Sequence, residues 1–116
     1  MNRDLDLIRL LLLLTDGDEP KLDFTPYTQA QWLYHSALLI EAKFVHGRTI
    51  ENGDGEIATT IRSRLTWTGH EFLDAARNDK IWKKAGEKIK HSGVQVTVSL
   101  LEELLKQLLK ESLGLP

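Results

Sequence analysis

The sequence contains no cysteine and only three prolines. Without thiols, neither disulfide bonds nor thiolate metal sites can form, which agrees with a reducing compartment. The dense apolar run near the start, Leu10 to Leu14, is far shorter than the ~20 residues needed to cross a bilayer. Charged residues precede this run and no small-residue cleavage site follows it. We therefore expect no membrane span, no signal peptide and a cytoplasmic location.

The sequence also lacks a basic excess, since its formal net charge is −2. Dedicated nucleic-acid binders are usually basic, because the neutralisation of phosphates supplies most of their non-specific affinity. The charge balance therefore counts against a DNA-binding protein. It leaves room for one, because a local basic patch can outweigh a neutral total.

No constellation typical of an enzyme is present. The four histidines are scattered, without the spacing of a zinc site, and we expect His35 and His70 to pack and hydrogen-bond at the edge of the core. The glycines do not form a phosphate-binding loop, and no serine has an obvious base beside it. We predict a non-catalytic protein with no cofactor, no metal site and no small-molecule substrate.

The chain is long enough for one domain with a real core. It has 116 residues, of which 41% are hydrophobic and 28% are charged. We predict a single domain over residues 1–116, with a core over 1–78 and a helical extension over 79–116.

Helical periodicity dominates the first part of the sequence. Apolar residues at helical spacing predict a first helix from Arg3 to Leu14, buried on most of its surface. A second helix is expected from Thr28 to Ala42. The residues predicted to line one face of this second helix are Trp32, Ser36, Leu39 and Ala42.

Two runs rich in β-branched residues follow, Phe44–Ile50 and Ile57–Leu65. Asn52-Gly53 lies between them, and this pair predicts a hairpin because both turn residues tolerate positive φ. Strict alternation in the second strand would turn Arg62 and Arg64 outward. The residues expected to share the packed face are Ile57, Thr59, Ile61, Ser63 and Leu65.

Three more helices are predicted after the hairpin. Either Thr66 or Thr68 can cap the first of these helices, and Thr68 with Glu71 fits a capping box. That helix should end near Arg77. Asp79 is the expected N-cap of the next helix, which should end near Gly93.

Val94–Val98 alternates and predicts either a short strand or a linker. A second capping box, Ser99 with Glu102, predicts the start of the last helix. Among the aromatic residues, Trp67, Phe72 and Trp82 are expected to belong to the core rather than to a ligand cage, because large aromatic side chains on a helix face are usually buried.

The order helix, helix, hairpin, helix, helix, helix carries most of the fold information. Leu38-Leu39-Ile40-Glu41-Ala42 before the hairpin, and Leu65-Thr66-Trp67-Thr68-Gly69 after it, resemble the corresponding segments of winged helices. Tyr34–Val45 also resembles the end of the recognition helix in small bacterial winged-helix repressors. We therefore predict an α+β, mainly helical fold: a winged-helix-like core with a β-hairpin wing and added C-terminal helices.

Nearly the whole chain is similar to a bacterial and prophage family called "domain of unknown function twenty-five thirteen". The matching segments are Arg3–Arg9, Tyr34-His35 with Leu38-Leu39, and Leu65–Arg77 followed by Asp79 and Trp82-Lys83-Lys84. The resemblance implies a shared fold and a prophage association, but it supplies no activity.

Two features depart from the winged-helix pattern. Lys43 stands where glycine is usual, at a position expected to need a left-handed backbone that costs a non-glycine residue ~1 kcal/mol. The segment before Thr28 also looks too short for the usual first helix of a helix-turn-helix, which weakens the case for insertion into a major groove.

Two functions remain open for the helix before the hairpin and for the wing. One is a DNA-binding transcriptional regulator of bacterial or prophage origin, and the other is a protein-interaction module that binds no nucleic acid. The same surface would serve both; the plain alternative is an ordinary solvated face. The candidate binding residues are Gln31, Tyr34, Lys43, Arg48, Arg62 and Arg64.

The leucine stripe of the last helix predicts a homodimer interface, or else packing of that helix against the first one. Both alternatives bury the same apolar side chains. The residues proposed for the dimer interface are Trp82, Leu101, Leu105 and Leu108.

Overall fold

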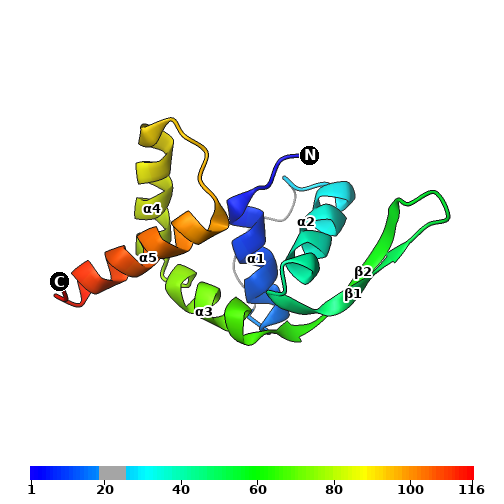
Figure 1. The fold of residues 1–116 in the computed structure, drawn as a ribbon, viewed down its shortest axis with the longest axis horizontal. Coiled ribbons are helices and arrows are strands. Elements are labelled where there is room, and N and C mark those ends of the chain that lie inside the picture. The colour runs from blue at the N-terminus through cyan, green and yellow to red at the C-terminus, as the bar shows by residue number, and fades with distance from the viewer. Residues whose placement is uncertain (19–25) are drawn as a thin grey trace. The chain divides into compact units, whose positions relative to one another are not determined.

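The computed structural model describes residues 1–18 and 26–116. Within these residues the chain forms five helices and one antiparallel hairpin, coloured in chain order in Figure 1. The elements are α1 (Leu5–Thr15), α2 (Gln29–Glu41), β1 (Val45–Glu51), β2 (Ile57–Leu65), α3 (Trp67–Ala76), α4 (Asp79–Ser92) and α5 (Val98–Ser112).

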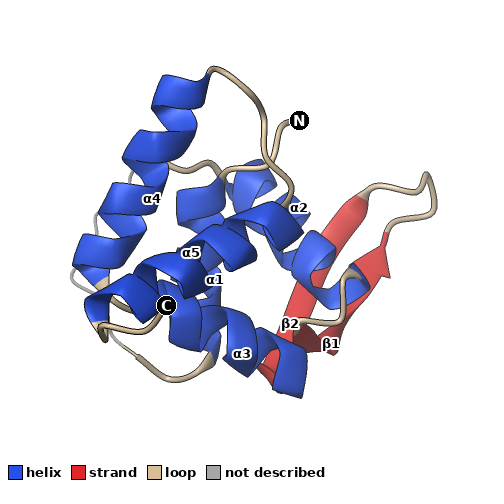
Figure 2. Ribbon diagram, turned by 60° about the vertical axis from the view of Figure 1, so that its left-hand side comes forward, coloured by secondary structure: helices blue, strands red, loops and turns tan. Residues whose placement is uncertain are grey.

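The predicted α+β, mainly helical class is confirmed, and the described elements are consistent with a winged-helix-like core that carries a hairpin wing (Figure 2). The chain divides into two compact units, Met1–His70 and Glu71–Pro116. The division predicted between residues 78 and 79 thus lies eight residues beyond the one in the structure. A single domain over the whole chain stays a prediction.

The first helix, α1, is almost entirely buried, as expected. Its run from Leu7 to Leu13 is buried at every position. The helix begins two residues later than predicted because Asp4 is its N-cap: the carboxylate accepts a hydrogen bond from the Leu7 N–H at 3.0 Å.

The second helix, α2, begins with a capping box. The Thr28 hydroxyl accepts from the Gln31 N–H at 3.1 Å, and the Gln31 side chain accepts from the Thr28 N–H at 2.8 Å. Ser36 and Leu39 are buried as predicted, but Ala42 is exposed because the helix ends at Glu41.

His35, which the predicted face omitted, is fully buried in α2. Its Nε2 accepts from the Asp4 N–H at 2.8 Å, and its Nδ1 lies 2.8 Å from the Gln31 carbonyl oxygen. Because Nε2 is an acceptor, Nδ1 carries the proton and donates to Gln31. This neutral imidazole ties the N-terminus of α1 to α2.

The chain leaves α2 through Lys43, whose φ of 66° is left-handed, as predicted. The Phe44 N–H bonds to the Leu39 carbonyl and the Lys43 N–H to the Ile40 carbonyl. These two bonds form a Schellman motif in which a lysine occupies the position that normally favours glycine.

The hairpin is confirmed, but its turn differs from the prediction. The Gly55 N–H bonds to the Asn52 carbonyl and the Asn52 N–H to the Glu56 carbonyl. Gly55, with a φ of 85°, is the residue with positive φ, whereas Asn52 and Gly53 are not. The loop therefore consists of Gly53, Asp54 and Gly55. In a three-residue loop the left-handed glycine is the third residue, whereas in the predicted Asn-Gly turn it would be the second.

A register shift between His46 and Gly47 breaks the alternation that we predicted for β2. Val45 pairs with Leu65 and His46 with Arg64, but Gly47 pairs with Arg62. Ser63 is thereby left without a partner, as in a β-bulge, and the residues from Thr59 to Arg62 face opposite to the prediction. A second shift, between Ile50 and Glu51, leaves Ala58 unpaired and ends this reversal before Ile57. A Cβ at Gly47 would meet the Ile61 carbonyl oxygen, so the close strand approach here needs glycine.

The caps of the remaining helices were predicted only in part. Thr66, one of the two predicted alternatives, caps α3, so the capping box at Thr68 is wrong. Asn78 rather than Asp79 caps α4. Thr97 rather than Ser99 caps α5. The segment between α4 and α5 is a linker without strand structure.

Within the second unit, α4 and α5 pack against each other. The buried residues of these two helices are Ile81, Ala85, Leu101, Leu105 and Leu108. Among the described helices, none combines the length and apolar character that a membrane span requires.

Candidate binding surface

The inner face of the hairpin packs on the helices of the first unit. Val45 and Leu65 are buried there, with exposed fractions of 2% and 3%. Arg62 lies on the same face: its Nη1 donates to the Leu11 carbonyl at 3.1 Å and to the Thr15 hydroxyl at 2.8 Å.

The predicted outward position of Arg62 is therefore wrong. Burial lowers the pKa of its guanidinium below the ordinary value, although arginine stays charged. The Thr15 hydroxyl itself donates to the Leu11 carbonyl at 2.7 Å, so Arg62 joins an existing hydrogen bond in the last turn of α1. Arg62 holds the hairpin against α1.

The outer face of the hairpin is solvent-exposed along its whole length. Strand pairing places six side chains on it, and all six are exposed. We call this set the outer hairpin face: His46, Arg48, Ile50, Thr59, Ile61 and Arg64. None of the six is acidic, whereas Asp54 and Glu56 lie in the distal turn, which projects beyond α2 in Figure 1.

Two large apolar residues are exposed on the outer hairpin face. Ile50 and Ile61 have exposed fractions of 40% and 42%. Arg48 lies directly opposite Ile61, because the two residues pair across the strands. Isoleucine side chains beside exposed arginines form a mixed apolar and cationic surface.

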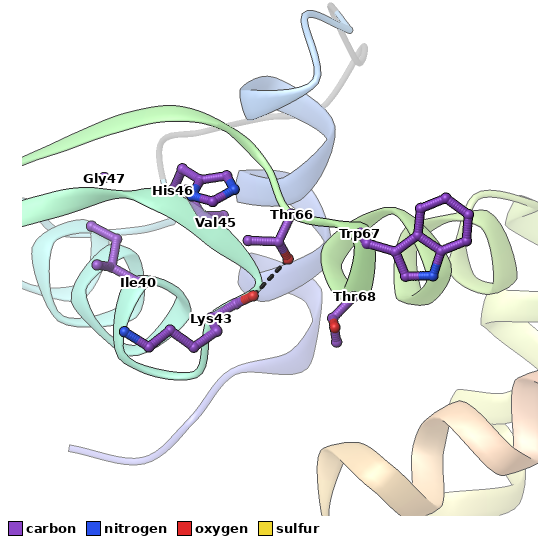
Figure 3. A pocket seen from close by; sticks show the side chains of 8 residues that line it. All are labelled: Ile40, Lys43, Val45, His46, Gly47, Thr66, Trp67 and Thr68. Atoms are coloured by element: carbon purple, nitrogen blue, oxygen red, sulfur yellow. Dashed lines mark hydrogen bonds between the residues drawn. The ribbon is translucent and has the colours of Figure 1, made fainter.

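An open pocket of about 330 Å³ lies at the base of the hairpin, where α2 ends and α3 begins (Figure 3). Lys43 and His46 contribute cationic or titratable side chains, and Trp67 contributes an aromatic ring. The residues that line the pocket are Ile40, Lys43, Val45, His46, Gly47, Thr66, Trp67 and Thr68.

Trp67 is the largest departure from the sequence-based expectation. We expected it in the core, but its exposed fraction is 80%. Phe72 is fully buried as expected, and Trp82 is half-buried. Trp67 is the first residue of α3, so its side chain precedes the apolar face that begins at Phe72.

Hydrogen bonds hold the junction beneath this pocket. The Thr66 hydroxyl donates to the Lys43 carbonyl at 2.6 Å and accepts from the Gly69 N–H at 3.0 Å. A Cβ at Gly69 would meet the Phe44 carbonyl oxygen, so glycine permits this packing. The junction is therefore a preformed support for the pocket.

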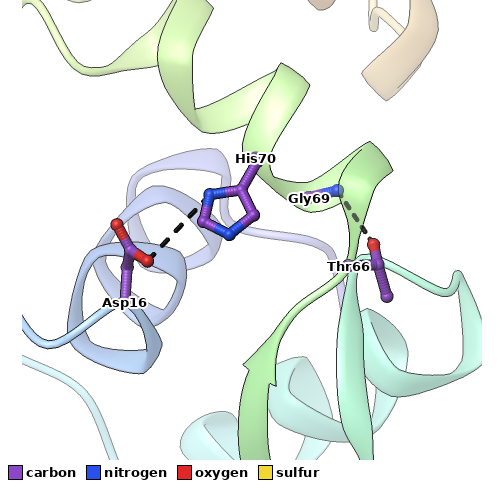
Figure 4. Close-up of polar contacts among 4 residues, drawn as sticks. All are labelled: Asp16, Thr66, Gly69 and His70. Carbon is purple, nitrogen blue, oxygen red and sulfur yellow. Dashed lines mark hydrogen bonds and ion pairs between the residues drawn. The ribbon is translucent and has the colours of Figure 1, made fainter.

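The same turn of α3 carries a weak ion pair (Figure 4). His70 Nδ1 lies 4.0 Å from the Asp16 carboxylate just after α1, and the His70 side chain is 49% exposed. At that distance and exposure the pair adds little stability. It links α3 to the residue that follows α1.

The six predicted binding residues do not form one site. Lys43, Arg48 and Arg64 lie at the hairpin base or on the outer hairpin face, while Arg62 points inward. Gln31 is engaged in the capping box of α2. Tyr34 is half-buried in α2, with its ring edge-on to His35 at a centroid distance of 5.5 Å.

The second helix makes a poor recognition helix for DNA. Its sequence from Gln29 to Glu41 contains no lysine or arginine. A helix that approaches a duplex normally needs cations near the phosphates. Among the residues that the structure describes in the first unit, Lys43, Arg48, Arg62 and Arg64 lie on the hairpin or at its base, whereas Arg3 precedes α1 and Arg9 is buried in it.

The leucines proposed for a dimer interface are already buried within the chain. Leu101, Leu105 and Leu108 have exposed fractions of 2%, 0% and 3%. A residue buried within one chain offers little area to a second copy. Dimerisation itself stays a prediction.

Sequence reasoning missed Ile50, Ile61, His46 and Trp67 as surface residues. The exposure of Ile61 could have been inferred from Gly47, because a glycine inside a strand often marks a bulge and a bulge changes which face the nearby residues occupy. In the part of the chain that the structure describes, no three histidines or carboxylates lie where they could hold a metal ion.

Comparison with known proteins places these features in a family. A family model described as "Hypothetical protein (DUF2513)" matches residues 2–95. An "Uncharacterized protein" of Haemophilus influenzae is 27% identical over 120 residues, which cover 98% of this chain and 100% of the relative. No solved structure matches the chain. With four-fifths of its residues under the family model, the chain belongs to the DUF2513 family.

Proposed function

We propose that the chain is a non-catalytic binding domain whose outer hairpin face binds a protein partner. The observation that carries this proposal is the exposure of Ile50 and Ile61 beside Arg48 and Arg64 on one face of the hairpin. Tryptophan and arginine are the residues most enriched among the energetic hot spots of protein interfaces. Trp67, at 80% exposed, supplies the aromatic residue at the base of the same hairpin.

The hairpin is suited to this role because its inner face is fixed. Val45, Leu65 and the hydrogen bonds of Arg62 hold it to the first unit. A preorganised surface loses little conformational entropy on binding, so more of the contact energy is available for affinity.

A DNA-binding regulator is the second candidate. Lys43, Arg48 and Arg64 favour it, because all three are exposed cations at or near the hairpin. Against it stand the acidic distal turn and the absence of cations from α2. The bacterial or prophage origin predicted from the resemblance stays a prediction for either candidate.

The substitution Ile61→Arg separates the two candidates. If the outer hairpin face binds a protein, an added charge should weaken that complex about 30-fold, as expected for a hot-spot loss of ~2 kcal/mol. If the face binds phosphates, an added cation should instead strengthen duplex DNA binding. Leu100→Arg is the matched control, since Leu100 is 52% exposed but lies in α5.

The experiment is capture of partners from a bacterial lysate by the wild-type chain and both variants, with and without nuclease. We expect a protein that the wild type and Leu100→Arg retain after nuclease treatment and that Ile61→Arg loses. Complete loss of capture on nuclease treatment would contradict the proposal, and so would equal capture by Ile61→Arg.

A further inference from the structure

The solvent side of α4 is strongly cationic. Five lysines lie on it, and every one is exposed. With two acidic residues, Asp79 and Glu87, the helix carries a net charge of +3, whereas the whole chain carries −2. The lysines are Lys80, Lys83, Lys84, Lys88 and Lys90.

The spacing of these lysines opposes helix stability. Lys80, Lys84 and Lys88 follow one another four residues apart, and like charges at that spacing repel. None of the five forms an ion pair with a residue that the structure describes. In α5, by contrast, Lys106 lies 3.2 Å from Glu102 four residues earlier. The charge of α4 thus lacks the compensation seen in α5.

We propose that this lysine face binds the phosphate backbone of nucleic acid without sequence preference. Four-residue steps place Lys80, Lys84 and Lys88 on one stripe about 12 Å long. Over that length each strand of a duplex carries about three or four phosphates. Lysine contacts phosphate as a flexible point charge and reads no base, so the contact positions the protein rather than selecting a sequence.

A membrane surface fits this helix less well. An interfacial helix inserts its apolar face among the lipids. In α4 the apolar residues Ile81 and Ala85 are buried in the folded chain, with exposed fractions of 8% and 0%. The exposed side carries the five lysines with Glu87 among them, and its net positive charge suits a polyanion. The lysine face is distinct from the outer hairpin face, so this proposal does not depend on the proposed protein partner.

The test is fluorescence anisotropy of a labelled 20-base-pair duplex of random sequence, titrated with the full chain between 50 and 200 mM NaCl. Three phosphate contacts predict a log–log salt slope of about −2.7, which weakens binding about 40-fold over that range. The double variant Lys84→Gln/Lys88→Gln should reduce the slope to about −0.9 and the loss to about 3.5-fold. A second duplex of unrelated sequence should bind equally well.

The matched control is Lys106→Gln/Lys110→Gln in α5, which lowers the net charge by the same amount and should keep the wild-type slope. Circular dichroism and thermal melting establish that both variants are folded. No duplex binding by the wild type at 50 mM NaCl overturns the proposal, as do equal slopes for the two double variants. Binding to phosphatidylserine vesicles without binding to the duplex overturns it in favour of a membrane surface.

Discussion

The two faces of the hairpin use similar residues for opposite purposes. On the inner face, Leu65 is 3% exposed and the Arg62 guanidinium hydrogen-bonds to α1. On the outer face, Ile61 is 42% exposed and Arg64 is free of such contacts among the described residues. Arg62 and Arg64 are two positions apart, yet a bulge between them turns one inward and the other outward. Register, and not residue type, decides which arginine supports the fold.

The largest effect that can test this comparison is expected for Leu65→Ala. Removing a buried leucine side chain should lower the free energy of unfolding by ~2–4 kcal/mol, through lost burial and a cavity. Ile61→Ala, on the outer face, should cost less than ~1 kcal/mol. Urea denaturation of both variants measures the difference. Equal losses would show that the two faces are not distinguished as the strand pairing indicates.

The next largest effect concerns the two arginines. Arg62→Gln should lower the free energy of unfolding by ~1–3 kcal/mol, because the Leu11 carbonyl and the Thr15 hydroxyl lose a charged donor. Arg64→Gln, with an exposed side chain, should stay within ~0.5 kcal/mol of the wild type. Thermal denaturation compares them. A larger loss for Arg64→Gln would reverse the assignment of the two faces.

The smallest effect is expected at Lys43, where the chain passes from α2 to the hairpin. Lys43→Gly should raise the free energy of unfolding by about 1 kcal/mol, because glycine adopts the left-handed backbone without a Cβ clash. Lys43→Ala keeps the Cβ and should bring no such gain. Stabilisation by both variants would mean that the charge of Lys43, rather than its backbone conformation, limits stability.

Much of the fold could be predicted from local signals. The buried α1 follows from a run of leucines too dense for one exposed face, and the hairpin follows from two β-branched runs around a glycine-containing turn. The left-handed Lys43 was predicted from the place where similar sequences carry glycine. Each of these features depends on residues close together in the chain.

Helix starts were predicted less accurately because suitable caps stand side by side. Thr66 and Thr68, or Asn78 and Asp79, can each accept a backbone hydrogen bond. Which one does so depends on where the preceding chain is held. For α3, the bond from the Thr66 hydroxyl to the Lys43 carbonyl joins the cap to the end of α2. No local pattern contains that partner.

The candidate surface could be predicted only in part. Arg48 and Arg64 are exposed, as expected of candidate binding residues. Ile61 was expected on the packed face but is exposed, and Arg62 was expected to point outward but lies on the inner face. Trp67 was assigned to the core because large aromatic side chains on a helix face are usually buried. It is exposed because, at about 3.6 residues per turn, it lies on the side of α3 away from the buried Phe72 and Leu73.

By itself the sequence determined the order and kind of the elements, the hairpin and the backbone reversal after α2, because periodicity, turn residues and caps act over a few neighbours. The tertiary structure decided which side of each element meets the core. A single unpaired residue at Ser63 inverts the facing of Thr59 to Arg62, and it lies where Gly47 closely approaches Ile61 on the other strand. Side-chain roles on this hairpin therefore depend on a long-range contact, which no short window of sequence contains.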